Sequence, residues 1–240
     1  MPPRQVAERA VSGRERDPER TRNEILEIAT REFAKHGYAG ARIDDMAERM
    51  RTTKRMIYYY FGGKEQLFIA VLERAYSAIR RAEREVDVDG LDPASAVRRL
   101  AELTFDHHES HPEFIRLVSI ENIHRAEHMA KSPAIAELGS PAIDLLARIL
   151  ERGRADEVFR PDVDAVDVHM MISAFCVFRI ANRHTFGTLF GRDLTHPALR
   201  EHYRTMLGDL VVDYISLPAK YVGPSASAAA SRRSPRSPRR

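Results

Sequence analysis

Helical spacing of apolar residues through almost the whole chain is the feature that most restricts its fold. Between residues 18 and 217 apolar side chains recur every three or four positions, and the period-two alternation of strands is absent. Prolines stand where the first turns of helices are expected, at Pro93, Pro112, Pro133 and Pro141. The spacing predicts an all-α fold of nine or ten helices.

The two ends of the chain lack this spacing. Residues 1–17 are polar, and residues 219–240 are rich in Ser, Pro and Arg, so we expect a disordered N-terminal arm and a disordered basic tail. From Gly223 onward the tail holds five arginines and no acidic residue, which exceeds the whole net charge of +3. No apolar leader or membrane-length run is visible, and Cys176 is the single cysteine. These features favour a cytoplasmic protein that has no membrane partner.

Aromatic and basic residues are concentrated in one short stretch, AERMRTTKRMIYYYFGGKEQLF, which runs from Ala47 to Phe68. Three helices are expected near it, with a tight connection between the second and the third, as in a helix-turn-helix DNA-binding unit. The third helix would bury Ile57 and Phe61 and present other residues outward. A tyrosine ring can lie against the sugar-phosphate edge, and its hydroxyl can donate to a phosphate oxygen.

The run AGARIDDMAERMRTTKRMIYYYFGGKEQLF, with TRNEILEIATREFAKHGY before it, resembles the DNA-binding domain of the TetR (tetracycline-repressor-like) regulators. The resemblance covers about residues 19–75, and the helical remainder agrees in length and layout. It implies a helix-turn-helix domain over 18–78 and a helical effector-binding and dimerisation domain over 79–218. The implied function is that of a repressor released from a palindromic operator in double-stranded DNA by a small-molecule effector. It implies no enzyme activity and no cofactor.

Two positions depart from the family pattern. Arg51 occupies the turn position where glycine is usual, so we expect a positive φ that costs roughly 1 kcal/mol. Arg42 stands at the entry of the second helix in place of a Ser or Thr cap, so any cap there must come from elsewhere.

The resemblance also implies roles for single residues. Base edges would be read by Lys54, Arg55 and Tyr58, and phosphates would be contacted by Arg42, Thr53, Tyr59, Tyr60 and Lys64. The alternative for the tyrosines is that they pack within the domain. The alternative for Lys54 and Arg55 is a solvated surface.

Two long apolar segments near the C-terminus suggest pairing of two copies. Residues 163–186 are apolar nearly all round, and 197–217 carry a second apolar stripe, so a two-fold dimer would bury both. The resemblance implies the same homodimer, built from the last two long helices of each copy. The candidate interface residues are Leu199, Tyr203, Met206, Leu207, Leu210 and Tyr214. A larger core within one chain is the alternative.

An effector pocket between the middle helices is implied by the resemblance. Its candidate residues combine apolar walls with a few polar groups: Phe105, Phe114, Leu117, Phe175, Phe178, Asn122, His169, Arg179 and Asn182. Arg179 could bind an anionic ligand. The alternative for Arg179 is an ion pair with Glu121 or a contact across the dimer.

Two pairs of histidines stand four residues apart, His107 with His111 and His124 with His128. This spacing places two imidazoles on one helix face, as metal sites require, but no cysteine or HExxH motif accompanies them. A histidine-based metal-binding protein or metalloenzyme carrying a helix-turn-helix is therefore the alternative function, and metal analysis would separate the two. A regulator that answers to no ligand, or to a protein partner, is a third possibility.

Overall fold

The structure is a computed structural model that describes residues 17–218, except for the side chains of residues 139 and 140. The arm expected over 1–17, apart from Asp17, and the tail expected over 219–240 lie outside the described residues. Within the described range the chain is helical, with one isolated antiparallel bridge between Phe159 and Ser216 and no strand. The prediction of an all-α fold is confirmed.

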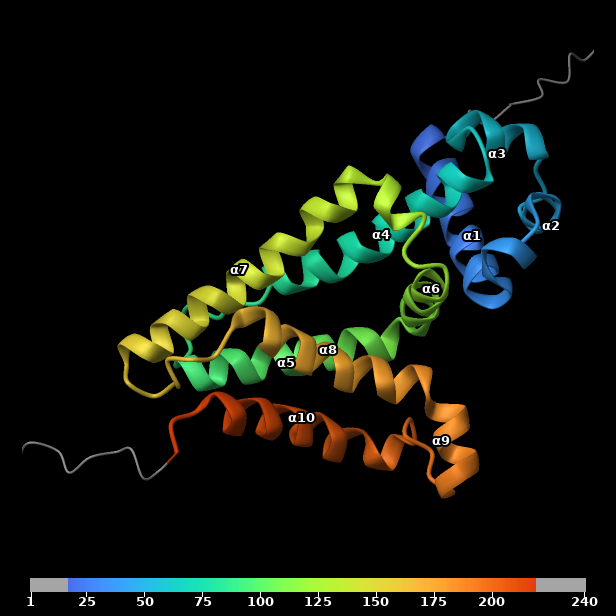
Figure 1. Ribbon diagram of the computed structural model, residues 1–240. Helices are drawn as coiled ribbons and strands as arrows, with labels where there is room; N and C mark the ends of the chain where they lie inside the picture. Colours follow the sequence, from blue (N-terminus) through green and yellow to red (C-terminus); the bar gives the residue numbers. More distant parts are fainter. Residues whose placement is uncertain (1–16, 219–240) are drawn as a thin grey trace, which may run out of the picture. The chain divides into compact units, whose positions relative to one another are not determined.

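The first compact unit of the chain ends at Val71. The boundary expected from the sequence was after residue 78, and both positions lie in the same helix, Lys64–Arg84. Asp17 caps the first helix of this unit by accepting the backbone N–H of Glu19 at 3.0 Å. Gly37, at φ 71° and ψ 173°, interrupts the same helix near its end. The helices of this part of the chain, coloured blue to cyan in Figure 1, are α1 (Pro18–Gly40), α2 (Ile43–Arg49), α3 (Lys54–Phe61) and α4 (Lys64–Arg84).

The core of the first unit is built by the apolar faces of these four helices. The rings of Phe33 and Phe68 meet edge to face with their centroids 4.8 Å apart. Around them lie further buried side chains, among them Ile25, Leu26, Met46, Ile57, Phe61 and Leu67. Because α3 contributes only Ile57 and Phe61 to this core, its other residues remain at or near the surface.

The second unit begins at Leu72, within α4, and contains the remaining helices. Asp92, Ser132 and Asp164 each accept a backbone N–H at the start of a helix, which explains where three of these helices begin. The elements are α5 (Pro93–Ser110), α6 (Pro112–Ile123), η1 (Met129–Lys131), α7 (Pro133–Ala155), α8 (Ala165–Ala181), α9 (Arg183–Phe190), η2 (Pro197–Leu199) and α10 (Arg200–Ile215).

Helix α5 is the centre of the second unit because α7, α8 and α10 all pack against it, and Figure 1 shows α5, α8 and α10 running side by side. Their buried side chains form one core, which includes Leu100, Phe105, Leu146, Ile172, Leu207 and Val211. Charged pairs link α10 to α5 at the edge of this core. Arg200 binds Asp106 and Glu109 at 2.5 and 2.6 Å, and Arg204 binds Glu102 at 2.9 Å.

The prediction that a helix begins at Pro141 is wrong, because α7 starts at Pro133 and continues through Pro141. A proline inside a helix removes one backbone hydrogen bond and costs about 3 kcal/mol. Ile135 before it and Ala142 and Leu146 after it are all buried, so one apolar face continues past the proline. Packing of that face outweighs the local loss.

Helices α8 and α9 meet at Asn182 with a bend of 70°. Within residues 17–218 no single helix is long and apolar enough to cross a membrane, and only this bent pair meets the criteria of length and composition.

Candidate nucleic-acid interface and effector site

Helix α3 separates its residues into a buried face and an outward face. Ile57 is buried in the core of the first unit, whereas Lys54, Arg55, Tyr58 and Tyr59 are exposed. Lys54 and Tyr58 are four residues apart, and so are Arg55 and Tyr59. All four residues therefore lie on one side of the helix. The outward face therefore combines two cations with two phenol rings.

The turn between α2 and α3 has the strained conformation that the sequence predicts. Arg51 has φ 51°, in the left-handed region, and its backbone N–H donates to the carbonyl of Glu48 at 3.0 Å. Thr52 donates in the same way to Ala47 at 3.0 Å, and Met50 is buried beneath the turn. These bonds hold the exposed Arg51 side chain next to the start of α3.

The residues at the helix entries have side chains without capping bonds. Arg42 and Thr53 occupy the N-cap positions of α2 and α3, but neither makes a side-chain cap hydrogen bond, and both are exposed. Lys54 is engaged in the free protein: its Nζ lies 3.1 Å from a carboxylate oxygen of Asp44 on α2. Both partners are about half exposed, so this pair is a weak surface contact that DNA could displace.

The three consecutive tyrosines differ in exposure. Tyr59 is 79% exposed and Tyr58 is 42% exposed, whereas Tyr60 is half-buried and meets the Tyr59 ring edge to face at 5.3 Å. Tyr59 is therefore not a core residue of this chain. Lys64 is also partly enclosed, because its Nζ donates to the carbonyl of Ala39 at 3.3 Å and lies 4.9 Å from the Tyr38 ring centre. Burial lowers the pKa of Lys64.

The nine residues expected to line an effector pocket are spread over different parts of the second unit. Phe105 and Leu117 are buried, and Phe105 belongs to the large core around α5. Phe178 is 50% exposed, and Asn122 is exposed and donates to the carbonyl of Val118. Phe175 and Asn182 are half-buried, and Phe175 packs against the large core. Two of the nine, Phe114 and His169, border a polar cluster described below.

Arg179 is held inside the protein by an ion pair, but its partner is not the Glu121 named as the alternative. Its Nη2 donates to Glu109 at 2.7 Å, its Nη1 donates to the carbonyl of Leu194 at 3.0 Å, and its guanidinium lies over the Phe105 ring at 4.1 Å. Glu121 instead accepts from the Nδ1 and the backbone N–H of His128. Arg179 therefore joins α8 to α5.

Sequence reasoning missed a buried polar cluster around Arg80. Arg80 is 6% exposed, and its guanidinium binds Glu83 at 2.5 Å. Three imidazoles lie close enough for its charge to lower their pKa: His107 and His108 on α5, and His169 on α8. Burial is the larger cause for each, and the pKa of His107 and of His108 falls to about 4. The rings of His107 and His108 are therefore neutral at pH 7.

Aromatic rings adjoin this cluster. Phe114 meets Tyr76 at 5.1 Å and His108 at 5.4 Å between ring centroids, and Ile115 and Ile180 are buried beside Phe114. A signal for the cluster was present in the sequence: Arg80 follows Ile79, stands four residues after Tyr76, and has Glu83 one turn further along α4. A cation at such a position indicates a buried polar partner.

The histidine pairs do not assemble a metal site within the part of the chain that the structure describes, where no three His, Cys, Asp or Glu side chains could hold an ion together. His107 and His111 stack with their centroids 4.2 Å apart, and the His111 Nδ1 contacts the His107 carbonyl. His128 binds Glu121, and His124 is exposed. This geometry gives no support to the metalloenzyme alternative.

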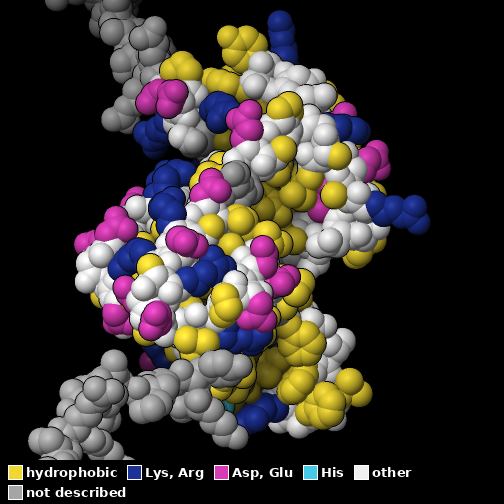
Figure 2. All heavy atoms as spheres, turned by 60° about the vertical axis from the view of Figure 1, so that its left-hand side comes forward, with side chains coloured by type: hydrophobic (Ala, Val, Ile, Leu, Met, Phe, Trp, Pro, Cys, Tyr) yellow, Lys and Arg dark blue, Asp and Glu magenta, His cyan; other side chains and the backbone are white. Residues whose placement is uncertain are grey.

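The predicted interface residues fall on two sides of α10. Tyr203 and Leu207 are buried in the core of the same chain, so they have little surface left for a second copy. Leu199 and Met206 are half-buried, whereas Leu210 and Tyr214 are 51% and 38% exposed. On the neighbouring α8, exposed apolar residues are Val166, Met170 and Phe178. Figure 2 shows hydrophobic side chains gathered at the lower right of the molecule. On α9, Leu189 and Phe190 are exposed.

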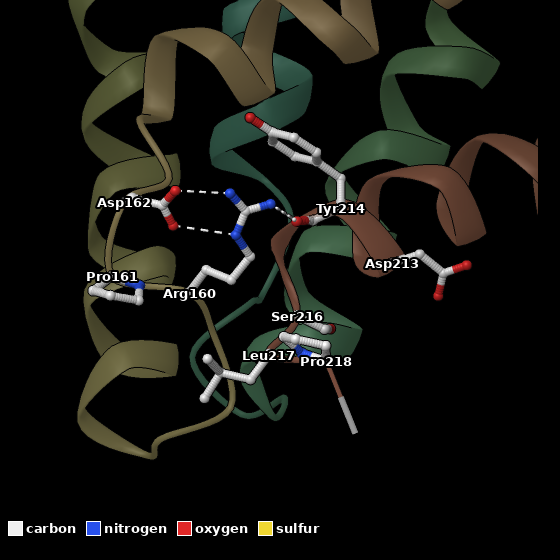
Figure 3. Close-up of a pocket in the computed structure, with 8 residues that line it drawn as sticks. All are labelled: Arg160, Pro161, Asp162, Asp213, Tyr214, Ser216, Leu217 and Pro218. Atoms are coloured by element: carbon white, nitrogen blue, oxygen red, sulfur yellow. Dashed lines mark hydrogen bonds and ion pairs between the residues drawn. The ribbon is translucent and has the colours of Figure 1, made fainter. Parts of the chain in front are cut away.

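A cavity of about 720 Å³ lies where α10 ends, and none of the nine predicted pocket residues lines it. Figure 3 shows two of its charged groups bound to each other: Arg160 binds both oxygens of Asp162, at 3.1 and 2.7 Å, and donates to the Tyr214 carbonyl. Because the Arg160 charge is already paired, and because the cavity adjoins Pro218, the last described residue, we assign it no ligand.

Both units match known families. Residues 25–71 match the family described as bacterial regulatory proteins, tetR family. Residues 93–211 match the family described as tetracyclin repressor-like, C-terminal domain. The first range contains the whole helix-turn-helix, and the second contains α5 to α8 and most of α10.

Individual proteins also resemble the chain over more than half of its length. The HTH-type transcriptional repressor NicS of Pseudomonas putida is 36% identical over 204 residues, which cover 85% of this chain and 96% of that protein. The HTH-type transcriptional repressor SCO4008 of Streptomyces coelicolor is 38% identical over 151 residues, covering 55% and 75%. The crystal structure of the regulator SCO4942 of Streptomyces coelicolor shares 28% identity at a TM-score of 0.62, covering 82% and 99%. This chain therefore belongs to the TetR family of bacterial transcriptional regulators.

Proposed function

We propose that this regulator is a repressor that binds a near-palindromic DNA operator as a homodimer and leaves it when a small molecule binds the second unit. The observation that carries the DNA-binding part is the outward face of α3. Lys54, Arg55, Tyr58 and Tyr59 are exposed together on a helix that follows a tight turn, as a recognition helix in the major groove requires.

The groups on this face suit different parts of DNA. Arg55 and Lys54 can donate to the O6 and N7 of guanine, and Tyr58 lies one turn further along the same side. Arg42, Thr53 and Tyr59 are exposed around them and can contact phosphates, which fix the position of the helix without reading sequence. Tyr60 and Lys64 are half-buried, so we assign them a smaller part in the contact.

Pairing of two copies is supported by the exposed apolar residues of α8 and α10. Val166, Met170 and Phe178 on α8 and Leu210 and Tyr214 on α10 are between 38% and 62% exposed, and these two helices contact each other. A two-fold axis at this surface would bury the residues of both copies against each other. Two copies related by this axis would carry two recognition helices, so the operator they bind would be palindromic.

Release by a ligand is supported by the continuity of α4. This helix begins at Lys64, directly after the recognition helix, and its later turns carry Tyr76 and Arg80 of the polar cluster. A ligand that changes the conformation of this helix would change DNA affinity, and such coupling is typically about 1–3 kcal/mol. The relatives NicS and SCO4008 are named repressors, which supports the same direction of regulation.

The decisive experiment is selection of bound fragments from random DNA by the purified protein without any ligand. We expect enrichment of a sequence with two inverted half-sites about one helical turn apart or slightly more. Arg55→Ala should abolish the enrichment, whereas Arg31→Ala, which removes an exposed arginine from α1, should not. Enrichment of no sequence, or of a single half-site bound by one copy, would overturn the proposal.

A further inference from the structure

We infer that the effector of this regulator is an organic anion, a carboxylate carried on an apolar body, held by Arg80 within the buried cluster of His107, His108 and His169. The inference rests on the proposed function and specifies its ligand. The cluster is formed by three helices of the second unit, α4, α5 and α8, with Tyr76 and Phe114 beside it.

One hydrogen-bond donor of the buried Arg80 side chain has no acceptor among the described residues. A guanidinium carries five N–H donors, and buried donors are normally all satisfied. Arg80 donates from Nη1 to Glu83, but its Nε is buried without a hydrogen-bond partner among the described residues. Glu83 is itself 5% exposed, and burial raises the pKa of its carboxyl group, which weakens it as a permanent counter-ion. A carboxylate ligand would supply the missing acceptor.

The imidazoles around Arg80 are neutral in the ligand-free protein but can respond to an anion. His108 donates from Nδ1 to the Thr104 carbonyl at 2.8 Å when neutral, so its other nitrogen is then unprotonated. The pKa of each ring is lowered by burial and by nearby positive charge, and an anion in the cluster acts in the opposite direction. Binding therefore favours protonation of a ring, which becomes a second charged donor to the same ligand.

The pH dependence follows from the groups that face these rings. They are the rings themselves, Arg80 with Glu83, His111 next to His107, and the phenol of Tyr76, whose pKa is raised by burial. Since the anion raises the pKa of the imidazoles from about 4 for His107 and His108, binding takes up protons, and affinity increases as pH falls from 7 towards 5. A site that used only the permanent charge of Arg80 would show no such dependence.

The apolar side chains near the cluster select an organic anion over an inorganic one. Phe114 lies edge to face with both Tyr76 and His108, and Val118, Val177 and Ile180 pack around it. An apolar body gains free energy in proportion to the area it buries there, whereas phosphate would lose its hydration with no such gain.

The test measures binding to the full-length protein by isothermal titration calorimetry, with benzoate and hexanoate as probes and benzamide, hexanamide and inorganic phosphate as comparators. We expect at least one of the two carboxylates to bind, with no binding of its amide or of phosphate. Arg80→Gln should weaken that binding by about tenfold or more, because a charge-assisted hydrogen bond is lost. The matched control is Arg81→Gln, which removes the adjacent exposed arginine of α4 and should leave affinity unchanged.

A second variant guards against misfolding. Arg80→Gln leaves Glu83 without its partner, so Arg80→Gln/Glu83→Gln, which replaces both charges by amides, should restore thermal stability without restoring binding. The inference is overturned if neither carboxylate binds the wild type at millimolar concentration, if an amide binds as tightly as its acid, or if the double variant keeps wild-type affinity. Operator selection needs no ligand, so the repressor proposal is judged separately: DNA binding without carboxylate binding removes only the inference made here.

Discussion

Replacing Tyr59 by Phe removes one hydroxyl group from the most exposed residue of the recognition helix. The ring is 79% exposed, and its remaining surface is covered chiefly on the side of Tyr60, whose ring is 5.3 Å away. The hydroxyl therefore has little part in folding, and Tyr59→Phe should leave thermal stability unchanged. Any loss of DNA affinity in this variant then reports a contact that the hydroxyl makes with DNA.

The exposed fraction also sets an upper limit on the cost of removing the whole ring. An aromatic side chain buries about 200 Å² when it is fully enclosed, and only a fifth of the Tyr59 side chain is covered, or about 40 Å². At about 25 cal/mol per Å² its truncation in Tyr59→Ala should cost about 1 kcal/mol. A ring that belonged to the core would cost about 3–5 kcal/mol.

The expected loss of affinity comes from one phosphate contact in each copy. A hydrogen bond of this kind contributes about 1 kcal/mol, so two copies on one operator lose about 2 kcal/mol, or about 30-fold in affinity. Fluorescence anisotropy with the selected operator and with unrelated DNA, at one fixed salt concentration, measures both losses. Since a phosphate contact carries no sequence information, the weakening should be similar for both DNAs.

A matched control is Ser77→Ala, which removes a hydroxyl from an exposed residue of the second unit and should not change DNA affinity. Unchanged affinity in Tyr59→Phe would remove Tyr59 from the proposed DNA contacts. A loss confined to the operator would instead make Tyr59 a reader of bases.

Three other perturbations test separate parts of the structure. Asp44→Asn frees Lys54 and removes a negative charge from the interface, so DNA binding should strengthen by about 0.2–1 kcal/mol for each copy, measured by the same anisotropy titration. Arg179→Met should lower the free energy of unfolding by about 3 kcal/mol in denaturant titration without changing carboxylate affinity, because this buried guanidinium binds Glu109 within the protein; unchanged stability would contradict that role. Leu210→Glu should convert a dimeric wild type into a folded monomer in sedimentation experiments, since Leu210 is 51% exposed and its replacement does not disturb the core.

The positions of most helices could be predicted because their signals are local. Asp17, Asp92 and Asp164 each stand where a helix begins, and their side chains accept backbone N–H groups within the next three residues. These caps depend on a few neighbouring residues and need no knowledge of the tertiary structure. The positive φ of Arg51 was expected from the family resemblance, in which glycine is usual at this turn position.

The face that each helix buries was harder to predict. In α10 apolar residues occur on more than one side, so Leu207 in the core and Leu210 at the surface look equivalent in the sequence. The partner of Arg179 is Glu109, 70 positions away on another helix, and no local pattern connects the two. Pro141 shows the reverse case, where a clear local signal is overruled by the continuous packing of α7.

The left-handed turn at Arg51 has a consequence for how this regulator can evolve. Glycine at this position would relieve about 1 kcal/mol of backbone strain, but it would also increase the conformational entropy of the unfolded chain by a similar amount. The two effects nearly cancel, so fold stability places little constraint on this choice. Replacing Arg51 by glycine removes a positive charge beside the recognition helix. If that charge contacts a phosphate, its loss reduces the slope of log affinity against log salt concentration by about one unit. Position 51 can therefore adjust the overall strength of DNA binding, while the operator sequence that α3 reads stays the same.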